Sequence, residues 1–192
     1  MSAELNGAVP AAVELPETVH AAPAAEGDGG ARDEESELIF SSFTEDDAWD
    51  LGNDMRNAAH ARQLPVCIDI RRPNGTELFH VSLARATVDN DDWARRKAAV
   101  VFRFEESSAR FGERFASAPA HPALAGWIDM NRFAPVGGSF PVRVAGAGIV
   151  AAVSASGLQG SGDHDFVVSA IRTFLERTRV FAPGTTGDRA DG

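Results

Sequence analysis

The sequence predicts an α/β sandwich in which a sheet of about five antiparallel strands is covered by three main helices. Two stretches rich in β-branched residues are each folded back by a turn signal, which is typical of hairpins. Three other stretches repeat apolar residues at helical spacing and must bury that face against the sheet. No glycine-rich dinucleotide-binding motif precedes a helix, so a Rossmann domain is not expected.

The first predicted elements are a short apolar strand and an amphipathic helix. Residues 38–43 are apolar enough for a strand or for an irregular segment that packs on the fold ahead of the first helix. Thr44 precedes three acidic residues, which is typical of an N-cap followed by acids in the first helical turn. Apolar residues then recur at helical spacing until Pro65, so a helix is expected from 45 to about 63.

A hairpin is predicted around Asn74-Gly75, the pair preferred in tight type I′ turns. If these two residues form the loop, Asp69 lies directly opposite His80 on a polar face that also carries Cys67. The other face is apolar and is expected to point toward the core. In this register the apolar pairs are Ile70 with Phe79, Ile68 with Val81, and Val66 with Leu83.

A long helix is expected from about 91 to 117, because the residues from 89 to 92 offer several N-caps. One stripe of this helix is apolar and should face the core. Lys97 lies on that stripe, where an unpaired ammonium would be costly to bury. The stripe consists of Trp93, Val100, Phe104, Phe111 and Phe115.

A second hairpin and a final helix complete the predicted fold. The strands at 140–144 and 149–156 are small and apolar, as expected beneath a covering helix. Asp163 is the expected N-cap of the last helix. Its inner face consists of Phe166, Val167, Ala170, Ile171 and Phe174.

The net charge of −10 is concentrated at the two ends of the chain. Residues 1–37 contribute −8 and lack aromatic residues, and residues 183–192 contribute −1. Both segments are too poor in apolar residues to form a core, so they are predicted to be disordered tails. The folded unit is then 38–182, with a charge of −1.

Several classes of protein and site are excluded or disfavoured by composition. The folded unit has no basic stripe, so a nucleic-acid partner is not expected. No apolar run approaches the ~20 residues that span a membrane. A single cysteine permits no intrachain disulfide and fits a reducing cytoplasm, and the N-terminus does not resemble a signal peptide. No local metal-ligand spacing is present, so no metal site is expected.

Several short motifs are similar to those of uncharacterised protein family 0303, in the haem-degrading-domain superfamily that includes GlcG and HbpS proteins. The resemblance spans about 38–180 and implies a profilin- or PAS-like α/β fold and homo-oligomers. For some relatives it implies binding of haem or another tetrapyrrole. The chain departs from the usual pattern at Ala151 and in the loop 158–162. The motifs are residues 68–72, 78–80, 89–97 and 137–142, with Ser156-Gly157 and Asp163-His164.

The pair of Asp69 and His80 is the most specific candidate site. A carboxylate opposite an imidazole fixes its tautomer, which suits ligation or proton transfer. The alternative is a polar cross-strand pair without a chemical role. Lys97, Arg71 and Arg95 are candidates for binding acidic groups of a ligand. The alternatives are a snorkelling lysine and a solvated basic face.

Gly137 and Gly138 permit positive φ and close approach of the backbone to a ligand, or they simply form a turn. His164 is a further candidate for reaching a metal or haem iron, against the simpler interpretation of a neighbour of the helix cap. Cys67 has no histidine at a spacing typical of a cysteine nucleophile.

The resemblance implies a small-molecule-binding protein of this superfamily, expected in the cytoplasm, with haem or another tetrapyrrole as a candidate ligand. Whether it is an enzyme stays open. A hydrolase or lyase that uses Asp69 and His80 is the least supported alternative, because no nucleophile or metal set accompanies the pair. The alternative is a non-enzymatic oligomeric interaction module that docks a partner protein.

Overall fold

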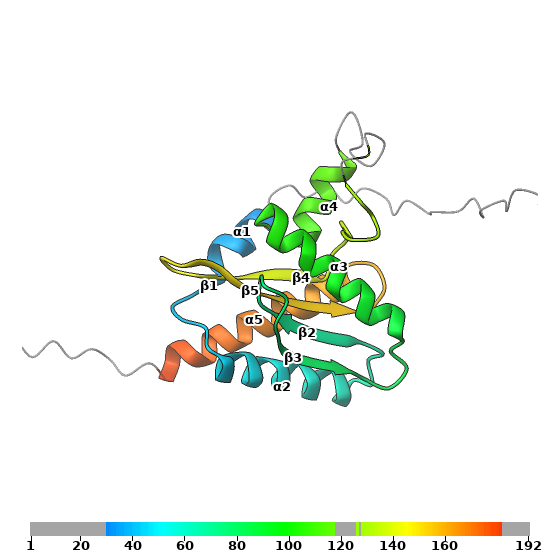
Figure 1. The fold of residues 1–192 in the computed structure, drawn as a ribbon. Coiled ribbons are helices and arrows are strands. Elements are labelled where there is room, and N and C mark those ends of the chain that lie inside the picture. The colour runs from blue at the N-terminus through cyan, green and yellow to red at the C-terminus, as the bar shows by residue number, and fades with distance from the viewer. Residues whose placement is uncertain (1–29, 118–125, 127, 182–192) are drawn as a thin grey trace, which may run out of the picture.

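The structure, a computed structural model, describes residues 30–117, 126 and 128–181. A five-stranded sheet lies between helices in this part of the chain (Figure 1). The predicted mixed α/β fold is therefore confirmed. The elements are α1 (Gly30–Glu37), β1 (Ile39–Phe40), α2 (Glu45–Ala61), β2 (Cys67–Arg71), β3 (Glu77–Ser82), α3 (Val88–Phe104), α4 (Ser108–Ala116), β4 (Ser139–Val144), β5 (Gly148–Ser156) and α5 (Gly162–Phe181).

The strand order is β1-β4-β5-β2-β3, so β5 and β2 join the two hairpins at the centre of the sheet. All neighbouring strands are antiparallel except β1, which runs parallel to β4. The expectation of a purely antiparallel sheet is wrong at this edge. No hairpin links β1 to β4, so a turn does not constrain their relative direction.

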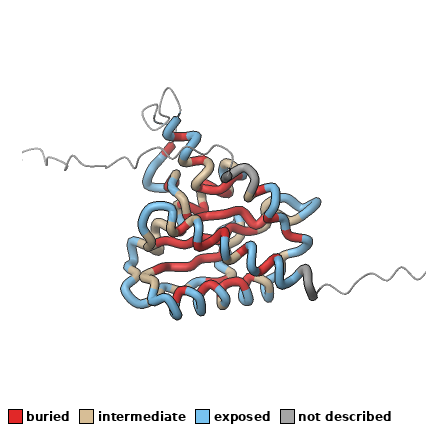
Figure 2. Tube along the Cα trace, turned by 180° about the vertical axis from the view of Figure 1, so that it is seen from behind, coloured by how far each residue is buried: buried red, intermediate tan, exposed pale blue. Residues whose placement is uncertain are grey.

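The two faces of the sheet are covered differently. Helices α2 and α5 pack on one face, and α3 packs on the other (Figure 1). The first face contains most of the apolar core, including Ile68, Ile70 and Phe140. Burial follows the strands and the inner sides of the helices (Figure 2). The face beneath α3 instead buries several polar side chains, which are Asp69, Ser139, Ser154 and Ser156.

The predicted register of the first hairpin is confirmed, with Ile68 opposite Val81 and Asp69 opposite His80. The expected type I′ turn is wrong. Gly75 N donates to Arg72 O at 2.9 Å, and Gly75 has φ +90°, whereas Asn74 has no positive φ. Pro73 therefore occupies the first central position of the turn, where its fixed negative φ is suitable. A register shift next to Arg71 then restores the predicted pairing of the two strands.

The long helix expected at 91–117 is wrong, because the chain forms two helices, α3 and α4. Helix α3 begins after Thr87, earlier than expected, and ends at Phe104, where the next residue, Glu105, has φ +57°. The side chain of Ser107 then accepts a hydrogen bond from Arg110 N and caps α4. The turn between the helices stacks Phe104 on Phe111 at a ring distance of 3.9 Å.

The predicted tails lie largely outside the described residues, which leaves 1–29 and 182–192 without a structural account. Residues 30–37 differ from the expectation because they form α1. Glu35 is 8% exposed, and its carboxylate accepts a hydrogen bond from Ser107 N at 2.7 Å. A carboxylate at the start of α4 is favourable, which explains why this acidic segment docks.

Candidate functional site

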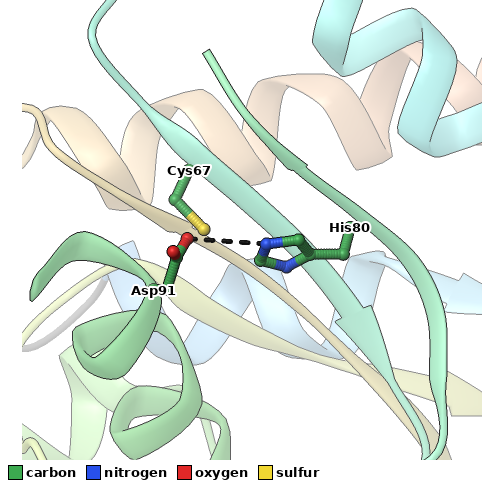
Figure 3. Close-up of side chains that lie close together, drawn as sticks. All are labelled: Cys67, His80 and Asp91. Atoms are coloured by element: carbon green, nitrogen blue, oxygen red, sulfur yellow. Dashed lines mark ion pairs between the residues drawn. The ribbon is translucent and has the colours of Figure 1, made fainter. Parts of the chain in front are cut away.

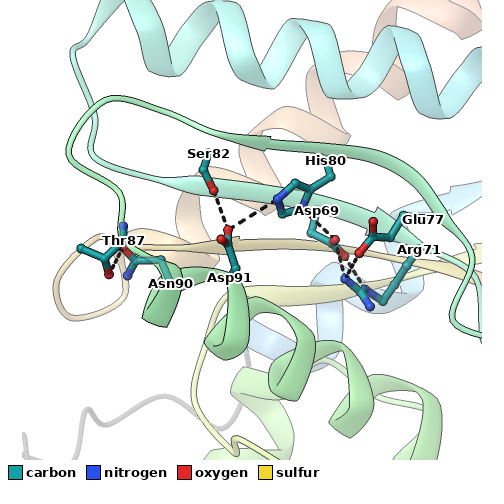
Figure 4. Close-up of polar contacts among 8 residues, drawn as sticks. All are labelled: Asp69, Arg71, Glu77, His80, Ser82, Thr87, Asn90 and Asp91. Atoms are coloured by element: carbon teal, nitrogen blue, oxygen red, sulfur yellow. Dashed lines mark hydrogen bonds and ion pairs between the residues drawn. The ribbon is translucent and has the colours of Figure 1, made fainter.

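A polar cluster lies between the β2–β3 hairpin and the first turn of α3 (Figure 4). Thr87 N donates to Asn90 Oδ1 at 2.8 Å, which fixes the start of α3 and places Asp91 over the hairpin. Ser82 Oγ donates to Asp91 Oδ1 at 2.5 Å. His80 Nε2 lies 3.5 Å from the same oxygen. The helix start therefore adds a carboxylate to the hairpin face that the sequence singled out.

Asp69 is 1% exposed and holds the other side of the imidazole. Its Oδ2 lies 3.2 Å from His80 Nδ1. Arg71 donates to both carboxylate oxygens of Asp69 at 2.6 Å and to Glu77 at 3.1 Å. Because the Asp69 carboxylate can only accept hydrogen bonds, His80 Nδ1 is the donor in this contact. Arg71 is thereby engaged within the protein.

Cys67 belongs to the same cluster and is fully buried. Its thiol, His80 and Asp91 face one another (Figure 3). Burial, assisted by the nearby Asp91, raises the pKa of Cys67. Hydrogen bonds from Ser82 and Cys67 lower the pKa of Asp91, so its carboxylate is charged at neutral pH. The protonated thiol is a poor nucleophile, although the fold brings His80 next to it.

Lys97 is 3% exposed and belongs to a second cluster. Its Nζ lies 2.6 Å from Asp163 Oδ2 and donates to Ala155 O at 3.2 Å. The lysine therefore does not snorkel to solvent, and its ammonium group already has a carboxylate partner. Gly138, with φ +124°, makes room for this pair, since an added Cβ would lie 2.7 Å from the Nζ of Lys97 and 2.6 Å from Ala155 O.

The other predicted site residues lie in different places, and only Gly137 shares a pocket with Lys97. Gly137, Lys97 and Trp93 line a polar pocket of about 330 Å³. Arg95 is exposed and paired with Asp92, away from both clusters. His164 Nε2 lies 3.1 Å from Glu34 in α1.

The predicted candidates therefore separate into two groups. Asp69, Arg71 and His80 lie on the hairpin, whereas Lys97 and Gly137 line the pocket near α5 and Gly138 adjoins Lys97. Arg95 belongs to neither group. Sequence reasoning missed the roles of three residues, because each partner comes from a distant element. These are Cys67, Asp91 and Asp163.

A wider pocket of about 470 Å³ runs along the outer strand β3 toward α2. Its lining includes His80 and the apolar rings of Phe79 and Trp49, which meet edge to face at a centroid distance of 5.9 Å. Trp49 is 60% exposed. Arg56 adds a cationic group to the same lining. The pocket thus combines an exposed aromatic ring with a cationic side chain, beside the strand that carries His80.

The sequence and the fold of this chain match a known family of proteins. The chain belongs to the family of HbpS-like haem degrading proteins, which it matches over residues 43–172. Within that class it is 43% identical to a UPF0303 protein of Streptomyces coelicolor over 143 residues, covering 74% of this chain and 90% of that protein. The resemblance noted from the sequence motifs is confirmed.

Solved structures support the same fold. The Ybr137w protein is 31% identical with a TM-score of 0.71, covering 78% of this chain and 87% of that one. A complex of PduOC with heme has a TM-score of 0.59 at 19% identity, covering 68% and 94%. The second likeness concerns the fold alone. Among the helices of the described residues, none is long and apolar enough to cross a membrane.

Proposed function

We propose that this protein binds haem or another tetrapyrrole, with His80 as the ligand to the iron. The observation that carries the proposal is the carboxylate-supported imidazole of His80, whose Nδ1 lies 3.2 Å from the buried Asp69. Hydrogen bonding at Nδ1 orients an imidazole and raises its strength as a ligand through Nε2. Membership of the haem-degrading family and the likeness in fold to a heme complex support the choice of ligand.

The surroundings of His80 fit a flat, partly apolar ligand. The side chain of His80 is 35% exposed and lines the pocket beside β3. Trp49, which is 60% exposed, offers an apolar ring beside the outer strand, and Arg56 offers a cation for a propionate. Bound haem would supply redox and ligand-binding chemistry, and no reaction is assigned. A cytoplasmic location belongs to the same proposal, supported by the single unpaired cysteine.

Titration of the protein with haemin tests this proposal through the Soret band. A saturable, shifted band is expected for the natural chain, and His80→Ala should lose it. His60→Ala is the matched control, because His60 is exposed on α2 outside the hairpin, and it should bind as the natural chain does. Absence of a saturable band, or an identical band in His80→Ala, would contradict the proposal.

A second candidate is an oligomeric interaction module that docks another protein chain. Strand β3 forms one edge of the sheet, and the exposed Trp49 lies beside it. An open strand edge next to an exposed aromatic residue is suited to pairing with another chain. Light scattering should then show a smaller assembly for Trp49→Glu than for the natural chain. An unchanged mass would argue against assembly through this edge.

A further inference from the structure

Three potential metal-binding side chains converge from three elements. Cys67 is the first residue of β2, His80 lies in β3, and Asp91 lies in the first turn of α3. The thiol sulfur, a ring nitrogen and a carboxylate oxygen all lie within 4.8 Å of one another. Zinc bonds of about 2.0–2.3 Å in a tetrahedron need donors roughly 3.3–3.8 Å apart. Small side-chain adjustments would therefore bring all three donors onto one ion.

The surrounding hydrogen bonds already orient two of the three donors (Figure 4). Asp69 holds Nδ1 of His80, which directs Nε2 toward Asp91 at 3.5 Å. Ser82 holds the carboxylate of Asp91. Metal-binding histidines commonly donate their second ring N–H to a carboxylate, and such partners fix both the tautomer and the ring orientation. The cluster thus has the supporting contacts of a metal site as well as the donors.

A second group of potential metal donors lies nearby, but a protein side chain already supplies a positive charge to it. Asp69, Glu77 and His80 also lie within 4.8 Å of one another, but the guanidinium of Arg71 donates to both carboxylates there. A cation is therefore already present in that group. Asp91 instead pairs with His80, and within the described residues no lysine or arginine forms an ion pair with it.

We propose that Cys67, His80 and Asp91 form a binding site for Zn²⁺. A thiolate, an imidazole and a carboxylate together are a donor set that zinc accepts, whereas Ca²⁺ and Mg²⁺ prefer oxygen alone. The thiol loses its proton to solvent when the metal binds. Three protein donors leave the fourth tetrahedral position for water or an external ligand.

This inference goes beyond the proposed haem binding and does not depend on it. Both use Nε2 of His80, so occupancy by Zn²⁺ excludes iron ligation by the same nitrogen. The two proposals still separate experimentally. Only the zinc site needs Cys67 and Asp91, and only haem binding gives a Soret band.

Cobalt binding to the full chain tests the zinc site directly, because Co²⁺ substitutes for Zn²⁺ and a cobalt–thiolate bond gives a near-ultraviolet charge-transfer band. The chain has a single cysteine, so such a band can come only from Cys67. The natural chain should develop the band at one equivalent of Co²⁺ and lose it when Zn²⁺ is added. The variants Cys67→Ser, His80→Gln and Asp91→Asn should each lack the saturable band.

Asp92→Asn is the matched control, because Asp92 is the next carboxylate along α3 but pairs with Arg95 and Arg96. It should bind Co²⁺ within twofold of the natural chain. Circular dichroism checks folding, and Asp91→Asn and His80→Gln decide the result if Cys67→Ser does not fold. The proposal is overturned if the natural chain gives no thiolate band, or if the band survives unchanged in these two variants.

Discussion

Lys97 is the only lysine in the chain, and its ammonium is buried against Asp163. Asp163 Oδ1 also accepts a hydrogen bond from Leu158 N at 2.9 Å, so the carboxylate links α3, α5 and the loop between β5 and α5. A buried ion pair of this kind contributes little to folding stability compared with apolar residues of similar size. Loss of one partner is nevertheless strongly destabilising, because it leaves an uncompensated buried charge. The pair thus holds these three parts of the fold together.

Lys97→Met should lower the free energy of unfolding by about 3–5 kcal/mol, because Asp163 is then buried without its cation. Urea denaturation measures the change, and adding Asp163→Asn to the same variant should recover part of it. Arg95→Met is the control, since an exposed pair with Asp92 is worth only ~0–1 kcal/mol. Equal effects of Lys97→Met and Arg95→Met would contradict the burial argument.

Cys67 should make stability depend on pH in the alkaline range. Its pKa is raised above the ordinary value of 9.0 by burial and by Asp91. Below pH 9.0 the thiol is protonated in both the folded and the unfolded chain. Above pH 9.0 the thiol of the unfolded chain loses its proton first, so unfolding becomes more favourable by up to about 1.4 kcal/mol per pH unit. The sign is therefore a loss of stability as the pH rises.

Unfolding free energies compared between about pH 8 and pH 10.5 should fall by roughly 2 kcal/mol more in the natural chain than in Cys67→Ala. The chain has no tyrosine, so phenol ionisation does not obscure the comparison. Parallel pH profiles for the two proteins would show that Cys67 is not buried as a thiol in the folded state.

At the scale of the elements, the break between α3 and α4 depends on Glu105 in the left-handed region, with φ +57°. Glycine adopts this conformation without the steric cost that a Cβ imposes. Glu105→Gly should therefore be more stable than Glu105→Ala by about 0.5–1 kcal/mol in thermal denaturation. The exposed side chain makes this pair of variants a clean comparison. A less stable glycine variant would mean that the break is set elsewhere.

Helices and hairpins were predictable where a local pattern determines them. The capping box of Thr44 with Asp47 was visible as Thr44 followed by acidic residues, and α2 forms there. The break after Phe104 was not visible, because no glycine or proline marks it and the apolar stripe continues through Phe111. Helical periodicity shows which side of a helix is apolar. It does not show a break in the helix when the apolar side continues beyond the break.

At the scale of the whole molecule, α1 joins the fold through a contact 72 residues away in sequence, from Ser107 N to Glu35. Glu35→Ala leaves this buried N–H without its acceptor and should lower the free energy of unfolding by about 1–3 kcal/mol. Glu37→Ala is the control, because Glu37 is exposed on the same helix, and it should change stability by less than about 0.5 kcal/mol. Urea denaturation that does not separate the two variants would show that α1 does not stabilise the domain.

The sequence by itself determined the fold class, the hairpin register and the opposition of Asp69 and His80, because alternation along a strand is a local property and the bulge next to Arg71 offset the misplaced turn. It also carried the motifs that identify the family. Only the tertiary structure decided that Asp91 joins His80 and Cys67, and that Lys97 is neutralised by Asp163. Periodicity shows which face a side chain occupies, whereas its partner depends on how α3 and α5 pack on the sheet.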